Sequence, residues 1–600
     1  MERAVQHMAG FLAAGFLVVA AVLGLWQAVL AGELRSSPLN PRQIDWAREV
    51  QLGQMFDRQG RLLVGTAGRS PQFHRVYREP SLAPVVGYRS LRLGLSGLEL
   101  TYADYLRGDG PGDPIGRLRA SLLHQPPVGA DLILTIDVDV QRAAAAALGD
   151  RAGAVVALDP RTGEVLALVS QPTYDPGRLE AEWERIREDP SHPLVNRATS
   201  GLYPPGSTFK VVTAAAAVEL GKVDLQERFP CQEGVVVEGW HLPCKSPPQP
   251  PTLTFAQALA WSSNPVFARV GLDLASPTPI DLGDDAPRPY WWETHGVLDS
   301  FEVLRAYAER FGIGSSIPFD LPTEDGQIIA SDEPTPVLVA ATAFGQGELL
   351  VTPLHMALVA ATVANDGLVP QPYLVAEIRQ PNGVTLHPHR PGEGQRRAIK
   401  PETAAVLRDM MRLGVTEGWA RTAALPNVAV AGKTGTAEVG GGADHHAWFI
   451  GFAPYEAPRV AVAVVVEHGG DGTAVAGPIA REVLAAALRR PDTREGAAVE
   501  AERNLERPTP APPAEVVEPE PTPQPTARPV RRVRVGNTDG MGVYIRRTPN
   551  LDDKLRAWPD GTVLEVVGEE VEQNGVRWRR VRDPAGNTGW VPIQYTIPEE

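Results

Sequence analysis

Five short apolar stretches constrain the fold of this 600-residue chain more than any other feature. Two come early, at residues 154–158 and 164–169, and the Asp-Pro-Arg-Thr-Gly turn between them is typical of a β-hairpin. The other three come much later, at residues 428–438, 447–453 and 459–467. The residues between the two groups are mostly helical in pattern. We therefore expect a five-stranded antiparallel sheet flanked by helices, with the first and last parts of the domain side by side.

The chain is long enough for several domains, and 57 prolines and 58 glycines indicate linkers and many turns. Residues 8–31 carry no charge and can span a bilayer, which predicts an N-terminal transmembrane helix; cleavage after Ala31 is the alternative. Turn signals and composition divide the remainder into a small α+β pedestal (dimerisation-type) domain, a catalytic domain, a Pro/Glu-rich disordered linker and a β-barrel of short strands. In that order, these parts are expected at residues 33–130, 131–490, 491–530 and 531–600.

The formal net charge of −15 argues against a nucleic-acid partner, which would require a basic stripe. The basic residues are almost all arginines, and an arginine cannot lose its proton in a protein, whereas a buried lysine can. A lysine in this chain is therefore unusually informative about proton transfer. The lysines are Lys210, Lys222, Lys245, Lys400, Lys433 and Lys554.

Lys210 ends the motif Tyr-Pro-Pro-Gly-Ser-Thr-Phe-Lys at residues 203–210. The two prolines and the glycine can start a helix but cannot continue one, so Ser207 is expected at or near a helix N-terminus. Lys210 then lies one turn later on the same face, beside the Ser207 hydroxyl. This is the pattern of a serine nucleophile with a lysine as its general base. A serine that caps a helix, followed by a solvated lysine, would give the same sequence pattern.

Two further motifs favour a catalytic role for Ser207 over a role as a helix cap. Ser-Ser-Asn at residues 262–264 ends an alanine-rich helix expected at 254–261, and Lys-Thr-Gly-Thr at residues 433–436 lies on the first of the late strands. Each motif says little when it stands alone. The three together, in this order and with the last on an apolar strand near the end of the domain, predict a site for serine acyl transfer.

With these motifs the chain resembles the penicillin-binding proteins, the serine acyltransferases of bacterial wall synthesis, and is similar to their class B, monofunctional type. The likeness runs to about residue 490 and includes Gly-Leu-Glu at 97–99 and Asn-Arg-Ala at 196–198. The stretch before the catalytic domain is far too short for the glycosyltransferase domain of the class A type. The C-terminal piece resembles a bacterial SH3-like domain through Gly-Val-Tyr-Ile-Arg at 542–546 and Gly-Trp-Val-Pro at 589–592.

The resemblance implies a catalytic domain with the serine transpeptidase/β-lactamase-like α/β fold and no cofactor. Ser207 would be acylated, Lys210 would take its proton, and Ser262 would relay a proton to the leaving group. Lys433 would be a fixed positive charge that keeps Lys210 neutral, and Asn264 would bind the substrate's amide backbone. The other expected substrate-binding residues follow Lys433 on the same strand: Thr434, Gly435 and Thr436.

The expected activity is D,D-transpeptidation, the cross-linking of peptidoglycan stem peptides that end in D-Ala-D-Ala, with β-lactams as inhibitors. The chain would be a single-pass protein of the cytoplasmic membrane with an extracytoplasmic catalytic domain. A glycosyltransferase and other wall-synthesis proteins, serving cell division or cell shape, would be its partners. Three alternatives stay open: a D,D-carboxypeptidase, a class D-like β-lactamase on the same fold, and a β-lactam sensor or scaffold.

The two cysteines, Cys231 and Cys244, are close enough in sequence for a loop-closing disulfide outside the membrane, which would stiffen the roof of the cleft; two reduced thiols fit equally well. Many relatives have a cysteine next to the asparagine of Ser-x-Asn, but this chain has Ser263 there. His445 and His446 are expected in a solvated loop, and no metal-ligand spacing supports a zinc site.

Overall fold

The computed structural model describes residues 50–68, 73–108, 128–231, 234–244, 251–275, 296–328, 334–440 and 443–489 of the chain. It also describes residues 532–535, 543–546, 554–558, 561–573, 576–584 and 588–598, and ten scattered helical residues between His7 and Val22. The chain forms two compact units, Met1–Leu505 and Glu506–Glu600.

The central sheet of the first unit has five antiparallel strands in the order β17-β18-β19-β7-β8. Strands β7 (Gly153–Leu158) and β8 (Val165–Gln171) form the early hairpin. The late strands are β17 (Ala431–Ala437), β18 (His446–Ala453) and β19 (Val460–Val466). Pairing of β19 with β7 joins the two ends of the domain, so the predicted five-stranded sheet is confirmed.

Both faces of this sheet are covered by helices. Successive strand residues point to opposite faces, so Val464 packs on one side and Val465 on the other. The Val464 side meets α8 (Val138–Leu148) and α18 (Ala476–Leu488), and the Val465 side meets the wholly buried α16 (Pro353–Ala364). Burial of both faces explains why these strands are continuous apolar runs rather than alternating ones.

Further helices lie between β8 and β17, and two of them begin at the motif residues Lys210 and Asn264. They are α9 (Leu179–Glu188), α10 (Arg197–Ser200), α11 (Lys210–Glu219), α12 (Phe255–Ala260), α13 (Asn264–Leu272), α14 (Gly296–Arg310), α15 (Pro336–Ala343) and α17 (Pro401–Thr416), with the 3₁₀ turns η2 (Gly206–Thr208) and η4 (Trp419–Ala423). Three small strand pairs complete this region: β9 (Arg228–Pro230) with β12 (Thr252–Thr254), β10 (Val235–Val237) with β11 (Trp240–Leu242), and β13 (Leu368–Val369) with β16 (Arg396–Arg397).

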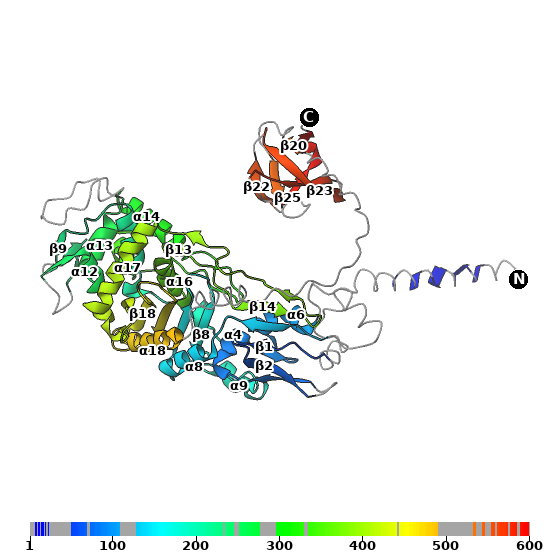
Figure 1. Cartoon of the computed structure of the whole chain (residues 1–600), viewed down its shortest axis with the longest axis horizontal. Helices are drawn as coiled ribbons and strands as arrows, with labels where there is room; N and C mark the ends of the chain where they lie inside the picture. The colour runs from blue at the N-terminus through cyan, green and yellow to red at the C-terminus, as the bar shows by residue number, and fades with distance from the viewer. Residues whose placement is uncertain are drawn as a thin grey trace, which may run out of the picture. The chain divides into compact units, whose positions relative to one another are not determined.

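A second sheet lies at the N-terminal part of this unit and has the order β15-β14-β6-β1-β2-β3. Its strands are β1 (Met55–Phe56), β2 (Leu62–Ala67), β3 (His74–Tyr77), β6 (Asp131–Leu134), β14 (Val375–Arg379) and β15 (Thr385–Leu386). Around it lie η1 (Pro80–Leu82), α4 (Ala83–Val86), α5 (Gly97–Thr101), α6 (Ala103–Arg107) and the pair β4 (Arg89–Ser90) and β5 (Gly94–Leu95). A turn at residues 57–60 joins β1 to β2. Strand β14, from much later in the chain, lies near β1 and β2 (Figure 1), so this sheet draws strands from both sides of residue 131.

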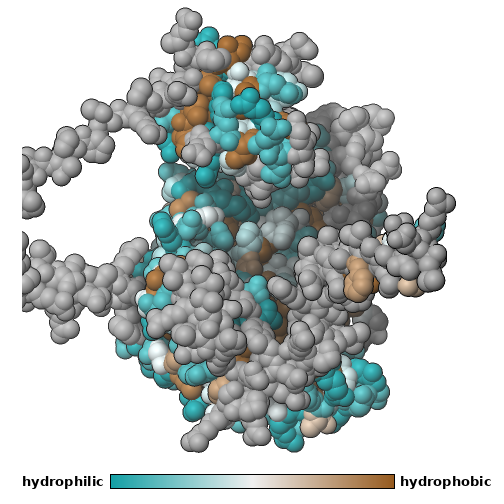
Figure 2. Space-filling view, turned by 90° about the vertical axis from the view of Figure 1, so that its right-hand side faces the viewer, coloured by the Kyte–Doolittle hydropathy of each residue, from teal (hydrophilic) through white to brown (hydrophobic). Residues whose placement is uncertain are grey.

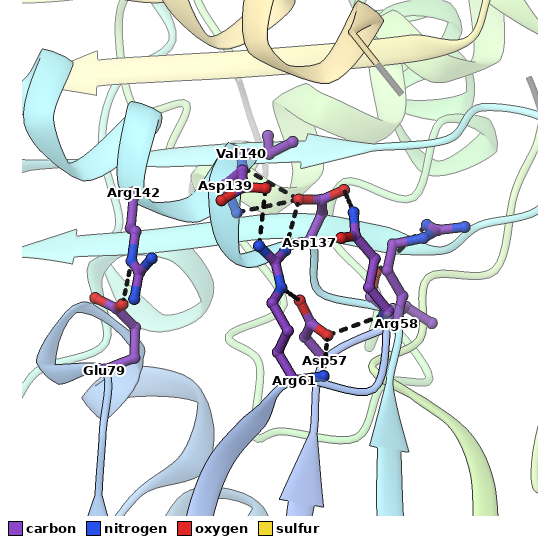
Figure 3. Close-up of polar contacts among 10 residues, drawn as sticks. Asp57, Arg58, Arg61, Glu79, Asp137, Asp139, Val140 and Arg142 are labelled. Atoms are coloured by element: carbon purple, nitrogen blue, oxygen red, sulfur yellow. Dashed lines mark hydrogen bonds and ion pairs between the residues drawn. The ribbon is translucent and has the colours of Figure 1, made fainter. Parts of the chain in front are cut away.

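Arg61 links the β1–β2 hairpin to the start of α8 (Figure 3). Its guanidinium lies 2.7 Å from the Asp57 carboxylate, 2.9 Å from that of Asp139 and 3.6 Å from that of Asp137. Asp57 and Asp137 are buried, and Asp137 also caps α8 by accepting backbone N–H groups. Two buried carboxylates therefore rely on one cation at the junction between the two sheets.

His355 is buried in the first turn of α16. Its Nδ1 accepts a hydrogen bond from the backbone N–H of Thr352 at 3.2 Å, and the Thr352 hydroxyl accepts one from the His355 N–H, which makes a capping box. Burial lowers the pKa of His355 to about 4. The core of the domain therefore holds a neutral histidine at neutral pH.

The second unit contains one antiparallel sheet in the order β22-β21-β25-β24-β23-β20-β26. Its strands are β20 (Arg532–Val535), β21 (Val543–Arg546), β22 (Lys554–Trp558), β23 (Val563–Gln573), β24 (Val576–Arg582), β25 (Thr588–Pro592) and β26 (Thr596–Pro598), with the turn η5 (Ile593–Tyr595). Val533, Ile545 and Leu564 are among the residues of its apolar core. Trp578 is buried as well.

The expected transmembrane segment at residues 8–31 and the expected linker at 491–530 lie largely or wholly outside the described residues. Within the residues that are described, no helix combines the length and apolar character needed to cross a bilayer. Figure 2 shows, on one face, small hydrophobic patches scattered among hydrophilic residues wherever the described chain is coloured.

Replacing Arg61 by Met should lower the free energy of unfolding of the first unit by about 2–3 kcal/mol, because Asp57 and Asp137 would keep buried carboxylates without their cation. The matched control is Arg142→Met. Arg142 pairs with Glu79 at 2.6 Å, but its side chain is 60% exposed, so its loss should cost less than about 1 kcal/mol. Urea unfolding of both variants measures the difference, and equal losses would contradict the role given to Arg61.

His355 should lower the free energy of unfolding of the first unit in mild acid. Its folded-state pKa of about 4 is below the ordinary value of 6.5, so the unfolded chain binds the proton first as the pH falls. Stability that is fully present above pH 6.5 should be lost progressively towards pH 4, by roughly 3 kcal/mol in total. Unfolding of His355→Asn should lack this part of the pH dependence, and the exposed His387→Asn should retain it. An identical pH dependence in all three proteins would contradict the assignment.

Candidate active site

Ser207 is held close to strand β17 by its own turn. It lies in the 3₁₀ turn η2, and helix α11 begins at Lys210, so the serine stands just before the helix and does not cap it. Gly206 has a φ of +54° and its N–H donates to the Gly345 carbonyl at 2.9 Å. A Cβ at Gly206 would come within 2.9 Å of the Thr436 carbonyl oxygen. Glycine at this position therefore lets the Ser207 turn approach the strand.

The Ser-Ser-Asn motif forms the turn between α12 and α13. Helix α12 ends at Ala260, and α13 begins at Asn264. Ser262 has a φ of +59°, in the left-handed region that a non-glycine residue seldom adopts. The turn brings the Ser262 carbonyl, the Ser262 hydroxyl and the Asn264 side chain to the same point, which is the amino group of Lys210.

The Lys210 amino group is where two of the three motifs meet. Its Nζ lies 3.1 Å from Ser207 Oγ, 2.8 Å from the Ser262 carbonyl, 3.2 Å from Ser262 Oγ and 2.6 Å from Asn264 Oδ1. The side chain is fully buried, and burial disfavours the charged form of a lysine. The carbonyl and amide oxygens can only accept, so they can take both hydrogens of a neutral amine. The lone pair of that amine is then available to the Ser207 hydroxyl.

Strand β17 supplies the third motif and is the edge strand of the central sheet. Lys433 is buried, and its Nζ donates to the Thr434 carbonyl at 2.7 Å. A cavity of about 340 Å³ opens between this strand and the two serines. Its lining residues are Ser207, Ser262, Trp419, Thr434, Gly435, Thr436, Asp471 and Thr473.

The structure therefore brings five of the eight predicted site residues to the lining of one cavity. Lys210 and Asn264 contact each other, Lys210 also contacts Ser207 and Ser262, and Lys433 lies beside Thr434. Ser262 and Lys210, which are 52 positions apart in the chain, are within hydrogen-bonding distance. The arrangement can deprotonate a hydroxyl and bind an extended, anionic ligand along a strand edge.

Three lining residues were missed by the sequence reasoning: Trp419, Asp471 and Thr473. The Trp419 indole N–H donates to the carbonyl of Trp261 at 2.9 Å, and the two rings pack edge to face just before Ser262. None of the three belongs to a motif or to a periodic pattern. They reach the cavity only because η4 and the loop after β19 pack against the Ser262 turn and β17.

The segment before Ser207 is anchored by Glu467, at the end of β19. The Glu467 carboxylate accepts hydrogen bonds from the Tyr203 hydroxyl at 2.7 Å and from the buried Arg197 guanidinium at 2.8 Å. Burial, together with this carboxylate, raises the pKa of Tyr203 far above its usual range, so the phenol remains a donor. The Trp448 indole N–H on β18 donates to the Pro204 carbonyl at 3.0 Å. The sheet thus fixes the chain on the N-terminal side of the serine.

The expectation for His446 was wrong, whereas His445 is exposed as expected. His446 begins β18, is buried and packs edge to face on the Tyr203 ring at 5.4 Å. Its Nδ1 accepts a hydrogen bond from the His468 N–H at 3.1 Å, and burial lowers its pKa. The sequence placed it in a loop because the neighbouring glycines end the strand pattern, but β18 starts earlier to pair with Ala437.

Cys231 and Cys244 form a disulfide, which the sequence had left undecided. The Sγ of Cys231 lies 3.7 Å from the hydroxyl of Ser263, which is the middle residue of the Ser-Ser-Asn turn. The bridge therefore closes the loop that carries β10 and β11 and touches the turn that contacts Lys210. Among the described residues, no three His, Cys, Asp or Glu side chains gather in a way that could hold a metal ion.

Comparisons with known proteins point to one family. The penicillin-binding protein transpeptidase domain matches residues 153–485. The chain is 36% identical over 499 residues to the peptidoglycan D,D-transpeptidase PbpA of Mycolicibacterium smegmatis, with 77% of this chain and 94% of that protein covered. It is 30% identical to the peptidoglycan D,D-transpeptidase MrdA of Escherichia coli, with 65% of this chain and 64% of that protein covered.

Solved structures agree with the sequence matches. The chain is similar to penicillin-binding protein A from M. tuberculosis in its ceftriaxone acyl-enzyme complex, with a TM-score of 0.64 and 33% identity. That likeness covers 74% of this chain and 99% of the other. The fold expected for the catalytic domain, the transpeptidase/β-lactamase-like one, is thereby confirmed.

Replacing Glu467 by Gln should loosen the segment that carries Ser207, because the buried Arg197 cation would lose its carboxylate partner. We expect amide hydrogen exchange at residues 203–209 to become about tenfold faster or more while the exchange of β7 is unchanged. The control is Glu456→Gln, which removes the same charge from an exposed turn. Equal exchange in both variants would contradict the anchoring role of Glu467.

Proposed function

We propose that this chain, which belongs to the class B type of the penicillin-binding protein transpeptidase family, is a peptidoglycan D,D-transpeptidase. It works through an acyl-enzyme on Ser207. β-Lactams acylate the same serine. The observation that carries the proposal is the Lys210 amino group, buried and within 3.1 Å of Ser207 Oγ while the Ser262–Asn264 turn occupies its other sides. This geometry supports Ser207 as the nucleophile and Lys210 as its base.

Acylation begins when Ser207 Oγ attacks the carbonyl carbon of the penultimate D-alanine. The Oγ–C bond forms as the Oγ proton passes to Lys210, and the carbonyl oxygen becomes an oxyanion held by the backbone N–H groups of Ser207 and Thr436. The C–N bond to the terminal D-alanine then breaks. Ser262, at 3.2 Å from Lys210 Nζ, relays a proton to the departing nitrogen.

The donor peptide lies along the exposed edge of β17. Gly435 has no side chain to obstruct it, and the cavity beside it is lined by the Thr434 and Thr436 side chains, whose hydroxyls suit a terminal carboxylate. Lys433 adds a fixed positive charge next to Thr434 and favours the neutral form of Lys210. Since Asn264 Oδ1 is engaged by Lys210, the NH₂ of its amide is the group that donates to a substrate carbonyl.

The proposal extends to the parts outside the catalytic domain, in the order that the sequence predicts. Residues 8–31 serve as a membrane anchor, 33–130 as a pedestal domain, and 491–530 as a linker to an SH3-like domain at 531–600. The antiparallel sheet of the second unit and its apolar core support a small β-barrel. The anchor would hold the catalytic domain, residues 131–490, on the outer side of the cytoplasmic membrane, where peptidoglycan and a glycosyltransferase partner are met.

A fluorescent penicillin tests this function. The full-length protein should become covalently labelled and release the label slowly, and Ser207→Ala should abolish labelling. Rapid release with penicillin turnover would favour a β-lactamase, and an unlabelled wild-type protein would favour a scaffold. Product analysis with two stem peptides then separates transpeptidation from carboxypeptidation.

Lys210→Arg in the same assay should slow labelling by at least about 100-fold, because arginine keeps the positive charge but cannot accept the serine proton. The control is Lys400→Arg, the same change at an exposed lysine that precedes α17. Labelling of Lys210→Arg at the wild-type rate would refute the role of Lys210 as base.

A further inference from the structure

Three residues that line the cavity, Trp419, Asp471 and Thr473, have no part in the acylation chemistry, and Asp471 is the charged one of the three. Asp471 follows β19 and is the one acidic residue among the described residues that line the cavity. It shares that lining with Ser207, Ser262 and Thr436. A carboxylate in a site that also binds the donor's carboxylate requires an explanation, because like charges in one cavity repel each other.

The position of Asp471 is fixed by the loop around it. The N–H of Gly472 faces Thr436 Oγ1 at 3.5 Å, and a Cβ at Gly472 would come within 2.2 Å of the Gly435 carbonyl oxygen. On the other side, the Thr422 hydroxyl donates to the Thr473 carbonyl at 2.7 Å. The loop is thus pressed against β17 and bonded to the η4 turn, which holds the Asp471 carboxylate at the cavity.

The groups at and beside the cavity suit ligands of both signs. Lys433 and the hydroxyls of β17 suit the donor's terminal carboxylate, whereas Asp471 suits a cation. The second substrate of a transpeptidase is a primary amine, which carries a positive charge in neutral water. We propose that Asp471 is a specificity-determining residue that binds the ammonium group of the acceptor stem peptide beside the acyl-enzyme. The inference rests on the proposed function and concerns which nucleophile resolves the acyl-enzyme.

The step itself balances without a proton from Asp471. The acceptor arrives as an ammonium ion, held by Asp471, and gives one proton to Lys210 to become a neutral amine. Its nitrogen then bonds to the acyl carbon while the C–Oγ bond to Ser207 breaks. A second proton of the amine returns to Ser207 Oγ, and the first is released to solvent from Lys210. Water, which is uncharged, gains nothing from Asp471, so the residue favours cross-linking over hydrolysis.

A purely structural role is the competing explanation. Asp471 Oδ1 accepts from the backbone N–H of Thr473 at 2.5 Å and thereby orders the turn that leads into α18. Asparagine offers the same acceptor oxygen without the charge, and it is equally suited to such turns. Asp471→Asn therefore removes the charge and keeps the turn, whereas Asp471→Ala removes both.

The experiment measures how the acyl-enzyme is partitioned. The full-length protein is supplied with a thioester donor that ends in D-alanine, and aminolysis by D-alanine amide is measured relative to hydrolysis, per acyl-enzyme formed. Methanol, an uncharged acceptor, is measured in parallel. Because the ratio is taken per acyl-enzyme, changes in the acylation rate do not enter it.

Asp471→Asn should require about tenfold more D-alanine amide for equal partition, with the methanol ratio unchanged, and Asp471→Glu should recover part of the loss. The control is Asp444→Asn, which removes the same charge from the exposed β17–β18 loop, outside the cavity lining, and should behave as wild type. An unchanged amine ratio in Asp471→Asn, an equal change with methanol, or an equal effect of Asp444→Asn would overturn the inference. Failure of the wild-type protein to form any acyl-enzyme would instead remove the proposed function and the inference with it.

Discussion

The pairing of β19 with β7 is the interaction on which the site depends. It joins strands that are more than 300 positions apart in the chain, with Val464 opposite Val155 and Ala463 opposite Val156. Each strand buries both faces, so the pairing is stabilised by helices on either side as well as by backbone hydrogen bonds. Because β17 and β18 extend the same sheet, this one closure brings the Lys-Thr-Gly strand to the turns that carry Ser207 and Ser262.

The distance between Ser207 and β17 then depends on two glycines, which have no side chain. A Cβ at Gly206 or at Gly472 would collide with the carbonyl groups of β17, so both neighbouring segments can approach the strand only as glycine. Glu467 and Trp448 hold the Ser207 segment from the sheet side. The nucleophile is therefore positioned by the rigid sheet, and the flexible side chain of Lys210 is held in place by the Ser262–Asn264 turn.

The features predicted correctly from the sequence are those that depend on residues close together along the chain. The continuous apolar runs predicted the buried strands, and the Asp-Pro-Arg-Thr-Gly turn predicted the β7–β8 hairpin. The scarcity of lysines drew attention to Lys210 and Lys433 before any neighbour was known. The prediction of a solvated loop for His446 was wrong because Tyr203 and His468 bury this side chain. Neither residue is close to His446 in the sequence, so no local pattern could indicate the contact.

By itself the sequence determined the five buried strands of the central sheet, the three motifs and the residue types able to perform acyl transfer, because these follow from side-chain chemistry and hydrophobic periodicity along a short stretch of chain. Only the tertiary structure decided that Lys210 faces Ser262 and Asn264, that the disulfide touches Ser263, that β14 joins the N-terminal sheet, and that Trp419 and Asp471 line the cavity. Each of these contacts joins segments that no local pattern links, and it exists only because β19 pairs with β7 and both faces of the sheet are buried.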